Sequence, residues 1–227
     1  MQANQTFERH YVWDLVVRSF HWTNAACILA LTITGYLMGS PPAILSELEA
    51  YNQYWFGTIR FLHFSAGYIL FINLLVRVYW AFRGSKYARW QEVLPHTRDK
   101  FEELVSVLKT DILQTRVSYD APLGHNALAG LTYVGFAVMV VIQVVTGFGL
   151  YEQMSSALIP NLFGWVVPLF GGDLLVKAIH HNMMWFFIIF TGVHIYIASY
   201  HDYVEGTGIL SSMFSGWKFH QKKETRK

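Results

Sequence analysis

Four histidines lie inside long apolar segments of this 227-residue chain, where an ionisable side chain is unexpected. They are His21, His63, His180 and His194. Placing an ionisable group at membrane depth is costly, and such a residue commonly marks a functional site. A hydrogen bond to a neighbouring helix explains a single buried histidine equally well, so the arrangement of the four decides between these interpretations.

The four histidines fall into two pairs when each segment is read as a helix and successive helices run in opposite directions. His180 and His194 are 14 residues apart, which is about 21 Å and nearly four helical turns, so both lie on almost the same face. Depth then pairs His63 with His180 on the outer side of the membrane and His21 with His194 on the inner side. Two histidines from facing helices can ligate a planar metal cofactor from both sides. The pairs therefore predict two b-type haems, one above the other.

A cation precedes three of these histidines by three residues, and residues at that spacing share a helix face. A haem propionate needs a cation near the membrane surface, and arginine can hold a carboxylate with two hydrogen bonds. Ordinary snorkelling of cations at the end of a membrane helix is the alternative explanation. The three candidate propionate ligands are Arg18, Arg60 and Lys177.

A polar dipeptide, His125–Asn126, opens the third apolar segment. Asn126 is a suitable N-cap for the predicted helix. The functional alternative is that both residues face the head group of a quinone near the inner haem.

Cys27 is the only cysteine. One thiol excludes a disulfide framework, a Cys-ligated zinc site and a protein-held iron–sulfur cluster, which takes about four thiolates. Covalent c-type haem is excluded too, because its attachment motif needs two cysteines. Zinc fits the histidines poorly, since each depth supplies two ligands and no nearby carboxylate.

The elements that must position the histidines are long and poorly charged. Only 14% of the residues are charged and 53% are apolar, whereas a soluble domain has about 25% charged residues. A spanning helix needs roughly 20 mostly apolar residues. The pattern predicts helices near 17–39, 57–82, 127–150 and 174–200, which makes the chain an all-α integral membrane protein with a four-helix transmembrane bundle in a single domain, 1–227.

Lysine and arginine are distributed unevenly among the connecting segments. The segments 40–56 and 151–176 contain none, whereas the segment 83–120 and the C-terminal tail are rich in them. Cytoplasmic loops carry the excess of positive charge, so both termini and the middle loop are expected in the cytoplasm. Apolar residues at helical spacing among charged neighbours also predict an amphipathic cytoplasmic helix near 98–114.

Distinctive stretches run in order along nearly the whole chain: HYVWDLVVRSFHW at 10–22, TGYLMGSPP at 34–42, IRFLHFSAG at 59–67, RVYWAFRGSKYAR at 77–89, GHNALAG at 124–130, TGFGLYEQ at 146–153, HHNMMW at 180–185 and VHIYIASYHD at 193–202. In these stretches the chain resembles the b-type cytochrome subunit of membrane-bound uptake nickel–iron hydrogenases. More distantly, its four-helix layout is similar to the cytochrome subunit of membrane formate dehydrogenases.

This resemblance implies two haems b whose ligands fall on the four histidines paired above by depth. It also implies a location in the bacterial cytoplasmic (inner) membrane. The implied partner is an outward-facing, periplasmic hydrogenase with a small iron–sulfur subunit and a large nickel–iron subunit. Electrons from hydrogen would pass through the outer and inner haems to the membrane quinone pool of a respiratory chain. The chain itself would conduct electrons and would not activate hydrogen.

Two other functions fit parts of the pattern. A cytochrome b subunit of a formate dehydrogenase or related reductase would share the haem sites and differ in its bound partner. A proton-coupled transporter could use the histidines as a proton relay, and it would bind no haem.

Overall fold

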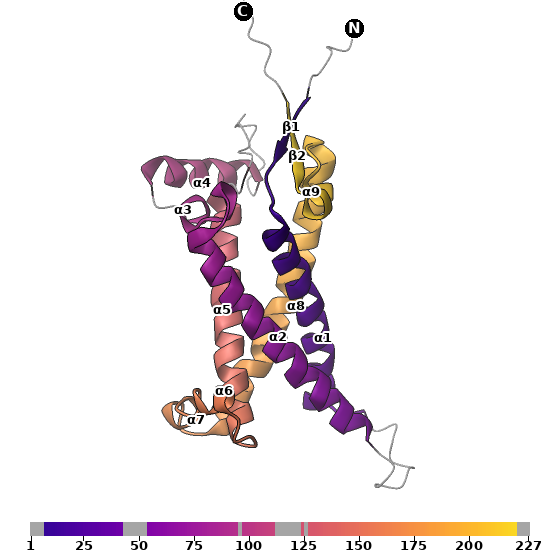
Figure 1. Ribbon diagram of the computed structural model, residues 1–227, viewed down its shortest axis with the longest axis vertical. Coiled ribbons are helices and arrows are strands. Elements are labelled where there is room, and N and C mark those ends of the chain that lie inside the picture. The colour runs from indigo at the N-terminus through magenta and orange to yellow at the C-terminus, as the bar shows by residue number, and fades with distance from the viewer. Residues whose placement is uncertain (1–6, 43–53, 95–96, 112–123, 125–126, 222–227) are drawn as a thin grey trace, which may run out of the picture. The chain divides into compact units, whose positions relative to one another are not determined.

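A computed structural model of the chain describes residues 7–42, 54–94, 97–111, 124 and 127–221. The described chain is mostly helical, with one short pair of strands (Figure 1). In order, its elements are β1 (Phe7–Tyr11), α1 (Leu15–Gly39), α2 (Trp55–Arg83), η3 (Lys86–Ala88), α3 (Trp90–Val93), α4 (Arg98–Asp111), α5 (Ala127–Glu152), α6 (Leu158–Asn161), α7 (Val166–Leu169), α8 (Asp173–Glu205), α9 (Ile209–Ser215) and β2 (Trp217–Gln221).

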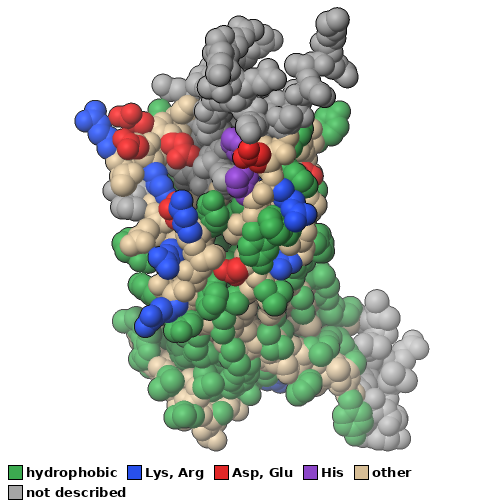
Figure 2. Space-filling model, turned by 45° about the horizontal axis from the view of Figure 1, so that its top comes forward, with side chains coloured by type: hydrophobic (Ala, Val, Ile, Leu, Met, Phe, Trp, Pro, Cys, Tyr) green, Lys and Arg blue, Asp and Glu red, His purple; other side chains and the backbone are tan. Residues whose placement is uncertain are grey.

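The helices α1, α2, α5 and α8 are each long and apolar enough to cross a membrane. Their apolar side chains face outward as well as inward, as Leu29, Ile72 and Ile189 show with 64%, 57% and 63% exposure. Hydrophobic side chains accordingly cover much of the surface in Figure 2. A helix that is apolar on all sides is typical of a membrane span. The expected all-α fold with four transmembrane helices is therefore confirmed.

Contacts within the chain define two compact units. The first unit comprises Met1–His21, Val76–Phe136 and Val193–Lys227. The second unit comprises Trp22–Leu75 and Ala137–Gly192. Each of the four long helices contributes residues to both units.

In the first unit, β1 and β2 form an antiparallel pair in which Phe7 lies opposite Gln221 and Tyr11 opposite Trp217. Gly216 joins α9 to β2 with a φ of +86°, a conformation that favours glycine. A Cβ at this position would lie 2.5 Å from the Tyr11 ring. The chain before α1 is therefore held against the segment after α8.

Asp14 immediately precedes α1 and also connects it to α2. Its Oδ1 accepts a hydrogen bond from the backbone N–H of Val17 at 2.9 Å, and its Oδ2 accepts one from the Trp80 indole at 3.0 Å. The first contact is an N-cap. Burial raises the pKa of Asp14, but the hydrogen bonds from Val17, Trp80 and Ser85 together lower it by more, so the net pKa lies below its usual value.

Replacing Asp14 with alanine is expected to destabilise the protein by about 2 kcal/mol, because the cap and the indole partner are both lost. Since folding lowers the pKa of Asp14, its stabilisation is complete above the unfolded pKa of about 3.9 and disappears as the pH falls through the lower folded value. Thermal unfolding in detergent, measured across this acid range, checks both expectations. The matched control is Glu102→Ala, which removes an exposed ion pair with Arg98 and should change little. Equal losses in the two variants would contradict the role of Asp14.

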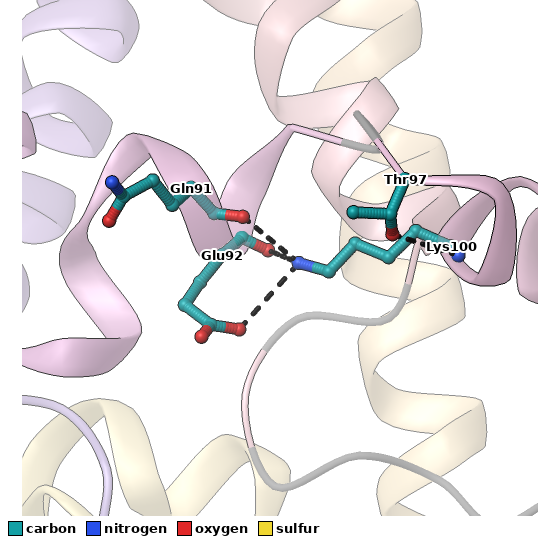
Figure 3. A network of polar contacts seen from close by, with 4 residues as sticks. All are labelled: Gln91, Glu92, Thr97 and Lys100. Atoms are coloured by element: carbon teal, nitrogen blue, oxygen red, sulfur yellow. Dashed lines mark hydrogen bonds and ion pairs between the residues drawn. The ribbon is translucent and has the colours of Figure 1, made fainter.

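The amphipathic helix expected near 98–114 corresponds to α4, and residues 112–114 lie outside the described part of the chain. Thr97 precedes the helix, and its Oγ1 accepts a hydrogen bond from the backbone N–H of Lys100 at 3.4 Å. The Lys100 ammonium donates to the carbonyls of Gln91 and Glu92 at 3.2 and 2.7 Å, as Figure 3 shows. These contacts attach the start of α4 to α3.

In the second unit, the segment after α5 packs on the end of that helix. Val166 and Val176 are fully buried, and Val145 and Leu150 of α5 pack against them. A Cβ on Gly149 would lie 2.7 Å from the Val166 side chain. The loop between α5 and α8 is therefore part of the packed unit that holds one of the histidine pairs.

Candidate cofactor site

His63 and His180 face each other in the second unit. His63 lies in the first third of α2, and His180 lies in the second turn of α8. Their ring centroids are 6.3 Å apart, and the ring planes are inclined by 68°. The structure therefore brings together two imidazoles from different helices, as a pair of axial ligands requires.

His21 and His194 form a second pair, in the first unit. His21 lies in the second turn of α1, and His194 lies in the C-terminal half of α8. Their ring centroids are 6.2 Å apart, with the planes inclined by 53°. Each unit thus contains one pair, and α8 supplies one histidine to each.

The ring separations fit a metal held between two imidazoles. A metal–nitrogen bond of about 2.0 Å, with roughly 1.2 Å from nitrogen to ring centre, puts two opposed imidazole centres about 6.4 Å apart. The observed 6.3 and 6.2 Å match this separation. Among the described residues there is no group of three or more His, Cys, Asp or Glu side chains that could hold a metal ion. Each pair therefore offers two protein ligands, the number that a six-coordinate haem iron takes from its protein.

Two glycines leave room for the rings of the His63–His180 pair. A Cβ on Gly35 of α1 would lie 3.3 Å from Cε1 of His63, and one on Gly147 of α5 would lie 3.0 Å from Cε1 of His180. Both distances are shorter than ordinary van der Waals contact. These positions therefore need the smallest residue if the rings are to keep their place.

Gly147→Ala is expected to displace the His180 ring, because the added Cβ would overlap its edge. Overpacking of this kind costs about 1–3 kcal/mol. The expected result is a lower unfolding temperature and less bound haem after purification, measured by thermal unfolding and by haem absorbance per chain.

Gly135→Ala on the same helix is the matched control, because a Cβ there would meet nothing within 4 Å. It should keep its haem, and its stability should stay the same or rise slightly because alanine favours helix. If both variants behave alike, the close approach of Gly147 to the ring has no consequence.

Thr34 and Thr146 are further site residues that the sequence analysis did not single out. Thr34 Oγ1 lies 2.9 Å from His63 Nδ1, and Thr146 Oγ1 lies 2.9 Å from His180 Nδ1. A signal for them existed in the sequence, since a Thr-Gly-aromatic tripeptide occurs at both 34–36 and 146–148.

The three predicted propionate ligands have protein partners in the structure. Arg18 donates a hydrogen bond to the backbone carbonyl of Phe214. Arg60 donates to Met154 Sδ at 2.9 Å. Lys177 forms an ion pair with Asp173 at 2.5 Å, one turn away on α8.

Arg77 is a buried cation that the sequence analysis also passed over. It lies in the first unit and is 7% exposed. Its Nη2 donates to the carbonyl of Ala88 at 3.1 Å. The guanidinium carbon is 5.0 Å from the centre of the Tyr133 ring and 5.8 Å from that of Phe20. Cation–π contacts at these distances help to hold a buried guanidinium.

The predicted quinone residues His125 and Asn126 lie outside the described residues. His181, which follows a candidate ligand, lies against α1. A Cβ on Gly39 would come within 2.9 Å of its Cε1. The His181 ring therefore packs against the end of α1.

A family model described as prokaryotic cytochrome b561 matches residues 12–216. The chain is 37% identical to a probable Ni/Fe-hydrogenase B-type cytochrome subunit of Azotobacter chroococcum mcd 1, over 92% of this chain and 88% of that protein. It is 37% identical to the protein of that name in Cupriavidus necator, over 95% of this chain and 89% of that one. It is 32% identical to a probable Ni/Fe-hydrogenase 1 B-type cytochrome subunit of Escherichia coli K12, over 97% and 95%.

Proposed function

The chain belongs to the prokaryotic cytochrome b561 family, and from this we propose that it is the membrane-anchored, di-haem electron-transfer subunit of a nickel–iron hydrogenase. Family membership and the four apolar helices make it a multi-pass membrane protein that uses haem b. The proposal adds that two haems pass electrons from a periplasmic hydrogenase to the quinone pool.

The observation that carries this proposal is the presence of two histidine pairs with the same separation. His63 and His180 have the spacing of opposed imidazole ligands, and so do His21 and His194. A bound haem b would supply a one-electron iron centre at each pair. The chain's part is to fix the ligands, exclude water with apolar side chains and set the potential through burial and hydrogen bonds.

The hydrogenase partner is inferred from the relatives, whose names describe them as probable Ni/Fe-hydrogenase B-type cytochrome subunits. Such a partner has a small iron–sulfur subunit and a large nickel–iron subunit, and it would contact the side on which His63 and His180 lie. The alternative partner is a formate dehydrogenase. Copurification from membranes distinguishes the two, because the bound dehydrogenase can be identified directly.

The direction of electron flow follows from the expected orientation. The segments rich in lysine and arginine favour an orientation with both termini in the cytoplasm, and we propose that the bundle lies in the bacterial inner membrane. His63 and His180 would then hold the outer haem, and His21 and His194 the inner one. We place the quinone near the inner haem, with His125 and Asn126 as candidate contacts.

The cations near the histidines remain candidates for the propionates. Lys177 and Asp173 form an exposed ion pair on the surface of α8. Exposed pairs of this kind contribute little stability, so Lys177 can exchange Asp173 for a propionate at small cost. We propose the same role for Arg18 and Arg60, whose present partners are an uncharged carbonyl and a thioether.

A reduced-minus-oxidised optical spectrum of the protein purified from membranes, with a pyridine haemochrome count, tests the proposal. Two haems b per chain are expected. Absence of haem in freshly prepared membranes would contradict the proposal and favour a proton-coupled transporter. One haem would contradict the di-haem assignment, provided that membranes give the same count before purification.

A further inference from the structure

Thr34 and Thr146 occupy equivalent places against the two histidines of the second unit. Each hydroxyl oxygen lies 2.9 Å from the Nδ1 atom of its histidine, which is His63 for Thr34 and His180 for Thr146. The threonines are 6% and 3% exposed. Buried polar groups are satisfied by hydrogen bonds, so each short contact is a hydrogen bond whose direction has to be settled.

Each threonine hydroxyl donates its proton to a backbone carbonyl and not to the histidine. Thr34 Oγ1 lies 2.6 Å from the carbonyl oxygen of Ala30, and Thr146 Oγ1 lies 2.7 Å from that of Ile142. A carbonyl oxygen can only accept, and a hydroxyl has one proton to donate. The oxygen therefore presents a lone pair to the ring, and the histidine nitrogen must be the donor.

This direction fixes the tautomer of both histidines. With the proton on Nδ1, the neutral ring carries its lone pair on Nε2, on the opposite side from the threonine. The amide of Gln143 agrees with this assignment at His180. Its Nε2, which can only donate, lies 3.5 Å from Nε2 of His180 and donates to the His180 carbonyl at 3.2 Å. Nε2 is therefore the unprotonated nitrogen of both rings and the atom that would bind a metal, and at His180 the Gln143 amide would give way to that metal.

The residue types suit this task. Threonine is β-branched, so few rotamers are available to it in a helix. The bond to the carbonyl four residues earlier then holds its hydroxyl in one direction. The glycine that follows each threonine leaves space for the ring edge, as the short Cβ distances at Gly35 and Gly147 show. In each Thr-Gly dipeptide, the threonine Oγ1 thus holds the histidine ring by a hydrogen bond, and the glycine leaves space for the ring edge.

We propose that Thr34 and Thr146 are positioning residues that hold His63 and His180 as Nδ1–H tautomers and lower the reduction potential of the haem bound between them. The inference rests on the proposed function, because it assigns a haem to this pair. A ligating histidine that donates its other N–H to an acceptor becomes a more basic ligand. A more basic ligand stabilises ferric iron relative to ferrous iron and so lowers the potential.

The test uses the full-length protein purified from membranes and the variants Thr34→Val and Thr146→Val. Valine keeps the branched shape and removes the hydroxyl. We expect each substitution to shift the ratio of oxidised to reduced haem at a given potential by about tenfold toward the reduced form, which is about 59 mV for one electron. An optically monitored redox titration measures this shift. The haem at the His21–His194 pair should keep its potential.

Thr132→Val is the matched control. Thr132 lies on the same helix as Thr146 and makes the same bond to its own backbone, since its exposed hydroxyl donates to the carbonyl of Leu128 at 2.8 Å. Both haem potentials should be unchanged in this variant. A shift as large as that of Thr146→Val would mean that loss of the helix-internal bond causes the effect, and it would overturn the proposal.

Serine variants decide the case in which a valine variant loses its haem. Thr34→Ser and Thr146→Ser retain the hydroxyl, so they should recover both the haem and the wild-type potential. Failure to recover them would show that the methyl group matters and overturn the proposal. Valine variants with two haems at wild-type potentials would also overturn it while leaving the di-haem function intact. Wild-type protein without haem would instead refute the proposed function.

Discussion

Replacing His63 with alanine should remove about half of the bound haem and leave the other half with an unchanged optical spectrum. His63 is one of the two imidazoles of its pair, and its ring centre lies 6.3 Å from that of His180. Loss of a residue that only hydrogen-bonds to a metal ligand typically lowers metal affinity 10–100-fold, and loss of the ligand itself lowers it more. The measurement is a pyridine haemochrome count per chain, combined with a low-temperature spectrum of the remaining haem.

His181→Ala is the control for this experiment. His181 lies in the same unit and is adjacent to a proposed ligand, and its ring packs against Gly39. It should retain both haems, although its packing changes. The assignment of the pair is wrong if His181→Ala loses as much haem as His63→Ala, or if His63→Ala keeps two low-spin haems.

Replacing His194 with alanine should separate the two halves of the electron path. In membranes that contain the hydrogenase, hydrogen should still reduce the haem at the His63–His180 pair, because that site is made of other residues. Reduction of quinone should fall by more than about 100-fold, because losing an axial ligand has a larger effect than losing a residue that only hydrogen-bonds to a ligand. Stopped-flow absorbance of the haem and a quinol assay on the same membranes measure the two steps.

His220→Ala provides the comparison, because His220 belongs to the same unit but lies on β2, opposite Glu8. Its quinone reduction should match that of the unaltered protein. Full quinone reduction in His194→Ala would mean that electrons leave the chain without passing the His21–His194 pair. In that case the proposed direction of electron flow would have to be abandoned.

The pairing of the histidines could be derived from the sequence because it depends on depth alone. Depth along a membrane helix follows from residue number at 1.5 Å per residue, and the apolar segments set the helix limits closely. His180 and His194 share a face of α8 because 14 residues are nearly a whole number of turns. The order of the helices and their alternating direction therefore suffice to predict that His63 lies at the depth of His180 and that His21 lies at the depth of His194.

The neighbours of the rings could not be derived in this way. Whether Thr34 or a residue one position away faces His63 depends on the rotation of α1 about its own axis, and depth does not fix that rotation. The sequence also does not predict the partners of the charged groups of Arg18, Arg60 and Lys177. Long flexible cations choose among several partners of similar energy, and here those partners are a carbonyl, a thioether and a carboxylate. Arg77 was missed because a single arginine near a helix end gives no signal of burial.

The strand pair also determines when the first unit can be completed. Phe7–Tyr11 are translated about 200 residues before their partners Trp217–Gln221. Chains are synthesised at roughly 5–20 residues per second, so many seconds pass between the translation of β1 and that of its partner strand β2. During that interval the helix that carries His21 has no α8 beside it, and His194 has yet to be inserted. If the His21–His194 pair holds a haem, as proposed, that haem can be captured only after α8 has been made, and a chain halted before α8 cannot hold a cofactor there.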